Sequence, residues 1–185
     1  QGCRGSFDEW DLEGAFVHSK ATSDDVTHDR ISNSLLKEAL WDSTPAAYNP
    51  FSAGVDSNIE RTLVDIYRYG ESSLTMFDFK VSNNEIMELP AGPLGLMFGM
   101  EFRHEKVSDD RDPRLDGTID YFDYEGDHYP EVSDAVNSSP TGDVSGSRDV
   151  TSLFAEAQVP IAANVNAQIA LRYEDLSDVE RTLVG

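Results

Sequence analysis

The sequence is poor in cysteine, in positive charge and in long apolar runs, and each shortage argues against a class of protein. Cys3 is the single cysteine among 185 residues, so neither an intrachain disulfide framework nor a cysteine-based zinc site is expected. Lys and Arg number 14 against 35 Asp and Glu. The resulting formal net charge of -21 disfavours nucleic acid as a partner, because a phosphate backbone attracts basic residues. No apolar run approaches the length of a membrane-spanning helix.

Motifs of catalysis and of metal binding are also missing. His18, His28, His104 and His128 are scattered, and none has metal-ligand spacing with another His, Asp or Glu on a helix. No serine lies in a nucleophile elbow. The acidic run 109–117 lacks the EF-hand register, which favours a solvated loop over a calcium site. We therefore expect no enzyme activity, no metal and no cofactor.

What the sequence does contain is a long alternation of apolar and polar side chains. In the stretch 94–103 every second residue is apolar and the others are mostly small or charged, a period of two that fits a strand and not a helix. Similar alternation predicts strands at 7–19, 72–82, 148–159 and 165–174. The apolar set of the central stretch is Leu94, Leu96, Phe98, Met100 and Phe102.

The predicted connections alternate in length: 24–71 is long, 90–93 is short, 108–147 is long and 160–164 is short. Successive connections of an up-and-down meander lie at opposite ends of the sheet, so the long ones gather at one end. That arrangement is typical of outer-membrane barrels, which have short periplasmic turns and long extracellular loops. The alternative is a soluble all-β ligand-binding module, a sandwich of the carbohydrate-binding type whose apolar faces form a core.

The first long connection carries two predicted short helices. An apolar stripe predicts a helix at 34–40, and the capping-box spacing of Ser57 and Glu60 predicts a second that ends at Gly70. The pair 83–84 indicates a bulge or a turn. The predicted fold class is all-β: an antiparallel up-and-down meander that forms part of a transmembrane β-barrel wall, with short helices in a long outer loop.

Several stretches resemble the barrel of TonB-dependent outer-membrane receptors. The stretch DFKVSNNEIMELPAGPLGLMFGMEFRHE at 78–105 is similar to family text that runs from "DFKVSG" through "ELPAGPVGLAVGAEYR". YNPF at 48–51 looks like a phrase of the preceding outer loop in that family. LFAE at 153–156 and ALRYEDLSD at 170–178 resemble "FAELNVPL…LAARYDDYSD". The resemblance extends in the same order over most of the chain from Trp10 onward and is weak in the acidic loop.

The resemblance implies an internal piece of a barrel wall over residues 1–185, about a quarter of the roughly 22 strands of such transporters. We expect the plug domain and the TonB-contacting segment to lie outside this chain. The implied protein is a receptor in the outer membrane of a Gram-negative bacterium. It would take up a scarce nutrient, either a siderophore, cobalamin or an oligosaccharide. Its expected partners are that ligand, outer-membrane lipid and the TonB complex, which acts through the missing parts of the receptor.

Two sets of residues are candidates for a functional role. Polar side chains on the strands either line the lumen of the barrel, facing the plug and the ligand, or pair across strands, and pairing is favoured for most of them. Aromatic side chains of the second long connection either stack on a ligand or pack the loop onto itself. The lumen-facing candidates are Asp78, Lys80, Glu101, Arg103, Glu156, Gln168 and Arg172, and the ligand-loop candidates are Tyr121, Phe122, Tyr124 and Tyr129.

Overall fold

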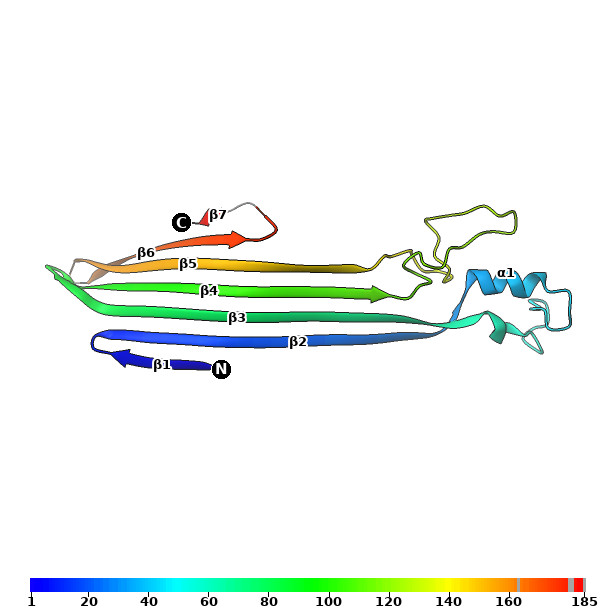
Figure 1. The fold of residues 1–185 in the computed structure, drawn as a ribbon, viewed down its shortest axis with the longest axis horizontal. Helices are drawn as coiled ribbons and strands as arrows, with labels where there is room; N and C mark the ends of the chain where they lie inside the picture. The colour runs from blue at the N-terminus through cyan, green and yellow to red at the C-terminus, as the bar shows by residue number, and fades with distance from the viewer. Residues whose placement is uncertain (163, 180–181, 185) are drawn as a thin grey trace. The chain divides into compact units, whose positions relative to one another are not determined.

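The computed structural model describes residues 1–162, 164–179 and 182–184 as an all-β chain. Seven strands follow one another in sequence order across a single antiparallel sheet, which is open and not closed into a barrel (Figure 1). The predicted all-β up-and-down meander is therefore confirmed. The strands are Gly2–Phe7 (β1), Trp10–Ile31 (β2), Leu63–Leu89 (β3), Gly92–Arg111 (β4), Val144–Ala162 (β5), Val165–Leu176 (β6) and Thr182–Val184 (β7).

The chain divides into two compact units. Unit 1 comprises Gln1–Ala21, Ser72–Lys106 and Gly146–Gly185, and unit 2 comprises Thr22–Glu71 and Val107–Ser145. Unit 1 holds β1, β6, β7 and most of β5, together with segments of β2, β3 and β4. Unit 2 holds the α-helix α1 (Asn33–Trp41), the 3-10 helix η1 (Ile59–Thr62) and the other segments of these strands.

The predicted strand 7–19 is in fact a hairpin followed by a longer strand. β1 and β2 are antiparallel, with Phe7 opposite Trp10, and the turn between them uses Asp8 at a φ of 57°. Aspartate tolerates this left-handed conformation better than most residues. β2 then continues to Ile31 through residues 24–30, which we predicted as part of the first long connection. Most of these residues are exposed, and a strand with two exposed faces needs no apolar alternation.

The second predicted helix is wrong. The structure has only η1 there, its N-cap Asn58 makes no side-chain capping bond, and β3 starts at Leu63. Within β3, Ile66 is buried while its neighbours Asp65 and Tyr67 are exposed, so the helical stripe that joined Ile66 to Tyr67 does not form. β-Branched and aromatic residues favour such a strand. β3 also continues without interruption through residues 83–84, so the predicted turn does not form there.

The connections sort by length between the two units. The turns at 8–9 and 90–91 belong to unit 1, whereas the long connections 32–62 and 112–143 belong to unit 2. The long connections are shorter than predicted, because β2, β3, β4 and β5 extend further into the polar sequence. The turn predicted at 90–93 forms at 90–91, and Gly92 follows it at a φ of 138°, which requires glycine.

The first predicted helix is confirmed as α1. Its N-cap is Ser32, whose hydroxyl oxygen accepts a hydrogen bond from the Leu35 N–H. The helix buries Ala39, as the apolar stripe predicts. Neither described helix is both long and apolar enough to span a membrane.

Few apolar side chains are buried. In the described part of the chain the buried apolar residues are Ala39, Ile66 and Ala135 of unit 2 and Val150 of unit 1. Three of these four lie in unit 2, beside polar residues such as Ser32 and Asp134 that are fully buried. The described residues of unit 1 thus form a sheet with little apolar core, of which Val150 is the buried member.

Candidate functional site

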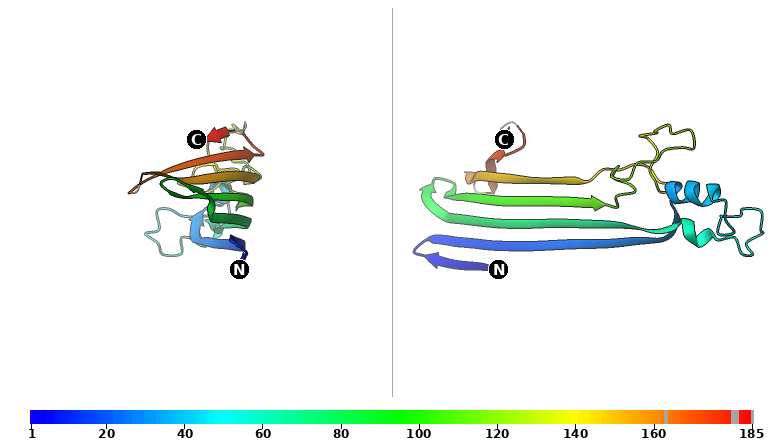
Figure 2. Two further views of the ribbon diagram at one scale, coloured as in Figure 1. Left: turned by 90° about the vertical axis from the view of Figure 1, so that its left-hand side faces the viewer. Right: turned by 45° about the vertical axis from the view of Figure 1, so that its right-hand side comes forward.

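The register of β5 and β6 separates two faces of the sheet in unit 1. Phe154 lies opposite Arg172 on one face, whereas Leu153 lies opposite Tyr173 on the other. Side chains that are opposite each other in an antiparallel pair share a face, so polar and apolar positions alternate together on both strands. The alternation predicted for this pair of strands is confirmed. β4, β5 and β6 run side by side in the further views of Figure 2.

Arg172 links three strands on the polar face of unit 1. Its Nε donates to Glu174 Oε1 at 2.7 Å, and its Nη2 donates to Ser152 Oγ of β5 at 3.1 Å. The same Nη2 lies 3.8 Å from Glu101 Oε1 on β4. Its guanidinium carbon lies 5.8 Å from the ring centroid of Phe154, within cation–π range. One side chain therefore pairs with carboxylates of two different strands.

Further ion pairs continue along the same face. Arg103 lies 3.7 Å from Glu101 and 2.9 Å from Glu105, and Arg148 of β5 donates to Glu105 at 2.8 Å. These contacts support the pairing interpretation for Glu101, Arg103 and Arg172. We call this set the ion-pair network; its members are Glu101, Arg103, Glu105, Arg148, Arg172 and Glu174.

The other lumen-facing candidates lie apart from the ion-pair network. Asp78 and Lys80 are on β3, Glu156 is on β5, and Gln168 is on β6 opposite Gln158. None of these four side chains has a hydrogen bond or an ion pair with another described residue. These four side chains are therefore available to contact a ligand or another polypeptide segment.

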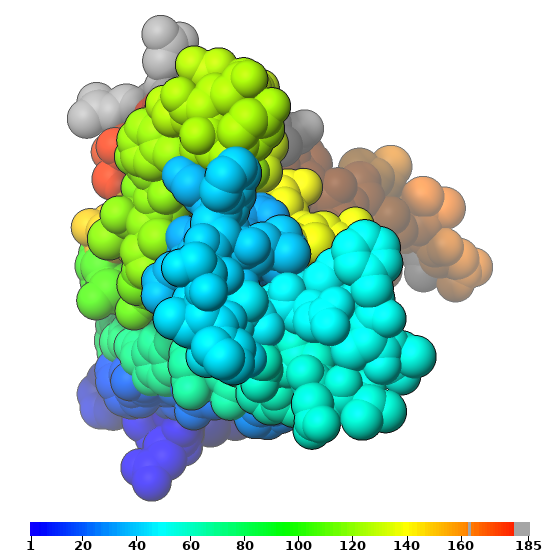
Figure 3. Space-filling model, turned by 90° about the vertical axis from the view of Figure 1, so that its right-hand side faces the viewer, coloured from blue at the N-terminus to red at the C-terminus, as the bar shows by residue number. Residues whose placement is uncertain are grey.

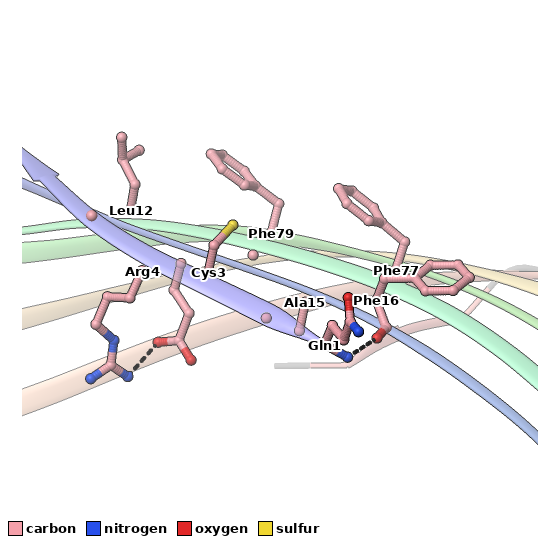
Figure 4. A pocket seen from close by; sticks show the side chains of 12 residues that line it. Gln1, Cys3, Arg4, Leu12, Ala15, Phe16, Phe77 and Phe79 are labelled. Carbon is pink, nitrogen blue, oxygen red and sulfur yellow. Dashed lines mark hydrogen bonds and ion pairs between the residues drawn. The ribbon is translucent and has the colours of Figure 1, made fainter.

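The apolar face of unit 1 is seen best around β1, β2 and β3. Figure 4 shows Leu12, Phe77 and Phe79 on one side of the sheet and Arg4 on the other. The Arg4 guanidinium is 2.9 Å from the Glu13 carboxylate on that opposite side. These apolar side chains line a hollow of about 690 Å³, to which Gln1, Arg4 and Glu13 also contribute.

On β4 and β6 of unit 1 the apolar residues are more exposed than the charged ones, the opposite of what a water-soluble sheet shows. On β4 the Glu101 side chain is 18% exposed, whereas Phe98 is 47% exposed. On β6, Leu171 is 57% exposed, and the neighbouring Arg172 side chain is 41% exposed. Charged groups on β4 are thus better covered than the apolar groups that alternate with them. In water, large contiguous apolar patches of this kind are rare.

Unit 2 brings three of the four ligand-loop candidates into contacts with other side chains. Tyr124 stacks on Trp41 of α1 with ring centroids 6.1 Å apart, and the Phe122 ring lies 5.0 Å from that of His128. The Tyr129 hydroxyl donates to Asp123 at 3.2 Å, and this bond raises the pKa of Tyr129. Tyr121 is half-buried in the same segment.

One acidic turn of unit 2 has oxygen atoms close enough to share a metal ion. Carboxylate oxygens of Asp123, Glu125 and Asp127 lie within 4.8 Å of one another. The Asp123 oxygen already accepts from the main-chain N–H groups of Asp127 and Glu125, and these bonds lower its pKa. These hydrogen bonds account for the conformation of the turn and for the position of the Asp123 carboxylate.

The acidic run at 109–117 is held by other contacts. Asp109 accepts two hydrogen bonds from Arg68 and one from Arg111. Asp112 is buried and accepts from the main-chain N–H groups of Tyr67 and Arg114. Asp109 belongs to the end of β4 and Asp112 is buried, so the solvated loop predicted for 109–117 is wrong at these two residues.

The contribution of α1 to a cavity beside the second long connection was not predicted from the sequence. Ser34, Lys37, Glu38 and Trp41 line a cavity together with Asp120 and Phe122 of the second long connection. The four helix residues have the spacing i, i+3, i+4 and i+7, which places them on one helix face. That face is the complement of the apolar stripe used to predict the helix, so the signal was present in the sequence.

Comparison with known proteins returns no match. No protein-family model matches the chain, and no curated protein or solved structure is detectably similar to it. The function is therefore inferred from the residues and their geometry.

Proposed function

We propose that this chain forms part of the barrel wall of a TonB-dependent outer-membrane receptor that takes up a scarce nutrient. The observation that carries the proposal is the inverted exposure on β4 of unit 1, where Phe98 is more exposed than Glu101. Burying one such apolar side chain away from water is worth about 1.5–3 kcal/mol. A lipid environment on the apolar face provides that gain, while the ion-pair network faces the lumen of the barrel.

The connections support the same proposal. The long connections 32–62 and 112–143 both belong to unit 2, and the two-residue turn 90–91 belongs to unit 1. Long extracellular loops and short periplasmic turns are characteristic of outer-membrane barrels. In the proposed receptor the long connections are extracellular and contact the ligand, and 90–91 is periplasmic.

The soluble alternative receives little support. A carbohydrate-binding sandwich needs a second sheet and an apolar core between the two sheets. The described strands form one sheet. Among the described residues of unit 1, Val150 is the single buried apolar residue.

The proposed partners follow from the proposed role. Outer-membrane lipid contacts the apolar face, the nutrient contacts the loops, and the TonB complex acts through parts of the receptor outside this chain. The proposed location is the outer membrane of a Gram-negative bacterium, and the nutrient is a siderophore, cobalamin or an oligosaccharide. No bond chemistry is assigned to any residue of the chain.

Epitope accessibility tests this proposal. One tag is inserted after Gly126 in the second long connection and another after Ala91 in the short turn, in the protein expressed in a Gram-negative host with the flanking sequence of its gene. We expect antibody to bind the first tag on intact cells and the second only after permeabilisation. Equal labelling of both tags on intact cells, or recovery of the protein in the soluble fraction, would contradict the proposal.

A further inference from the structure

A cavity in unit 2 lies between α1 and the segment that contains Asp120 and Phe122. Its volume is about 390 Å³, within the usual range for small-molecule sites. Helix α1 contributes one face, with Ser34, Lys37, Glu38 and Trp41. In Figure 3 the helix (light blue) and the second long connection (yellow-green) lie against each other on the surface of the molecule.

Aromatic rings border this cavity and remain open to solvent. Trp41 is 70% exposed although it stacks on Tyr124, which is 67% exposed. Phe122, on the opposite wall, is also exposed. Exposed rings of this size cost free energy in water and offer their faces to a ligand.

Negative charge surrounds the same rings. Glu38 lies 3.7 Å from Arg61, which pairs more closely with Asp42 at 2.6 Å. Asp120 lies 3.3 Å from His128. The side chains of Glu38 and Asp120 stay 71% and 49% exposed, so both carboxylates can approach a ligand in the cavity.

Lys37, which also lines the cavity, is engaged in hydrogen bonds to the second long connection. The Lys37 ammonium donates to the main-chain oxygens of Asp123 at 2.8 Å and Phe122 at 3.3 Å, which fastens α1 to the second long connection. Unit 2 as a whole contains 20 of the 35 acidic side chains and 6 of the 14 basic ones. Such an excess repels anions and attracts cations.

We propose that this cavity binds an organic cation, an alkylated ammonium group that lies against Trp41 and faces Glu38 and Asp120. Aromatic faces attract cations through their quadrupole, and nearby carboxylates add direct attraction. This inference deepens the proposed function and rests on it for its biological meaning, since the cation would be part of the nutrient that the outer loops recognise. The negative charge of unit 2 disfavours an anionic nutrient in this cavity.

Tryptophan fluorescence measures this binding directly. The chain has two tryptophans, so the Trp10→Phe variant leaves Trp41 as the single reporter. The probe is choline, compared with its uncharged analogue in which carbon replaces the nitrogen, and with methyl glucoside. The protein is held in a polyoxyethylene detergent, which carries neither an ammonium group nor a sugar ring.

We expect choline to bind between about two- and thirtyfold more tightly than the uncharged analogue, the range given by cation–π energies. Equal binding of the two, tighter binding of methyl glucoside, or no saturable response to choline would each overturn the inference. Because the assay measures binding and not membrane location, it can fail while the epitope test succeeds, and the reverse also holds.

Paired charge variants localise the site. The double variant Glu38→Gln/Asp120→Asn removes both carboxylates from the cavity and is expected to weaken choline binding by at least about threefold, in proportion to the loss of attraction. The matched control Glu60→Gln/Glu131→Gln removes the same charge from exposed positions of unit 2 outside the cavity. An equal effect of the two double variants would show that only the general charge of unit 2 matters and would overturn the assignment to this cavity.

Discussion

The Arg172 guanidinium on β6 lies 3.8 Å from the Glu101 carboxylate on β4, although β5 separates the two strands. It lies over the ring of Phe154 and donates hydrogen bonds to Glu174 and Ser152. The ion-pair network therefore connects strands that are not neighbours in the sheet. Such contacts stabilise the sheet against separation of β6 from β4.

Arg172→Gln should destabilise the chain by about 1 kcal/mol, since it removes a cation–π contact and two partly exposed ion pairs. Thermal unfolding in detergent micelles, followed by circular dichroism, measures the change. The control is Arg4→Gln, because Arg4 pairs only with Glu13 among the described residues and its side chain is 76% exposed. An Arg172 variant no less stable than the Arg4 variant would contradict this role of the network.

Gly99 provides the space in which Phe154 lies. A Cβ atom added at Gly99 would be 2.2 Å from Phe154 Cζ, so the ring must leave its place over the backbone. Gly99→Ala should cost about 1–3 kcal/mol of unfolding free energy, the usual range for overpacking. Gly5→Ala is the control, because no atom lies within 4 Å of its added Cβ.

The second variant Phe154→Ala, combined with Gly99→Ala, tests the cause of this cost. If the clash with the ring is responsible, the double variant should lose less stability than the two single changes added together. Additive losses would show that the glycine matters for a reason other than the ring.

Asp134 fastens the two long connections to each other. Its carboxylate is fully buried, and it accepts from the Ser32 hydroxyl and the Ser34 N–H, each at 2.7 Å, and from Arg114. Asp134→Ala leaves Ser32, Ser34 and Arg114 without this buried partner, a loss of about 1–3 kcal/mol. We expect amide hydrogen exchange to accelerate across residues 32–62, far away in sequence.

Glu131→Ala serves as the control for that experiment, because Glu131 is exposed and close to Asp134 in sequence. Unchanged exchange at 32–62 in the Asp134 variant would mean that the connections are held together by other contacts.

Asp42 should titrate at an unusually low pH. The Thr44 hydroxyl and main-chain N–H, followed by the Arg61 guanidinium, lower the pKa of Asp42 from 3.8 to about 2. A depressed pKa means that the ionised form stabilises the fold. The stabilisation is complete above the unfolded pKa of 3.8 and is lost as the pH falls through about 2.

Carbon-13 NMR of the Asp42 carboxyl group measures this titration. Thr44→Val should raise the pKa of Asp42 toward its ordinary value, whereas Thr27→Val, on the exposed part of β2, should leave it unchanged. A midpoint near 3.8 in the unchanged protein would contradict the described contacts.

The elements that could be predicted from sequence depend on local signals. The strands around Phe98 and Ile169 follow from their two-residue alternation, and α1 follows from its apolar stripe and the cap at Ser32. The segment at Ile66 and Tyr67 fits both helical and strand spacing. It is a strand in the structure, where β3 pairs with β2 and β4. Short local patterns cannot resolve such a choice.

The candidate sites depend on contacts that no local pattern encodes. The alternation places Glu101 and Arg172 on polar faces, but their pairing requires the register of three strands and the gap that Gly99 leaves for Phe154. In unit 2, the contact of Trp41 with Tyr124 joins residues of two different connections. The cavity is formed jointly by α1 and the second long connection, which are far apart in sequence.

Site-directed spin labelling shows whether the apolar face of β4 contacts lipid. Nitroxides are attached to single cysteines at Phe98 and Met100, and for comparison at Met97 and Glu101, in a Cys3→Ser background within lipid vesicles. If this face contacts lipid, the labels at 98 and 100 should be highly accessible to oxygen and poorly accessible to a nickel chelate, and the labels at 97 and 101 should show the reverse. Equal accessibility at all four positions, or ready access of the nickel chelate to 98 and 100, would contradict lipid contact.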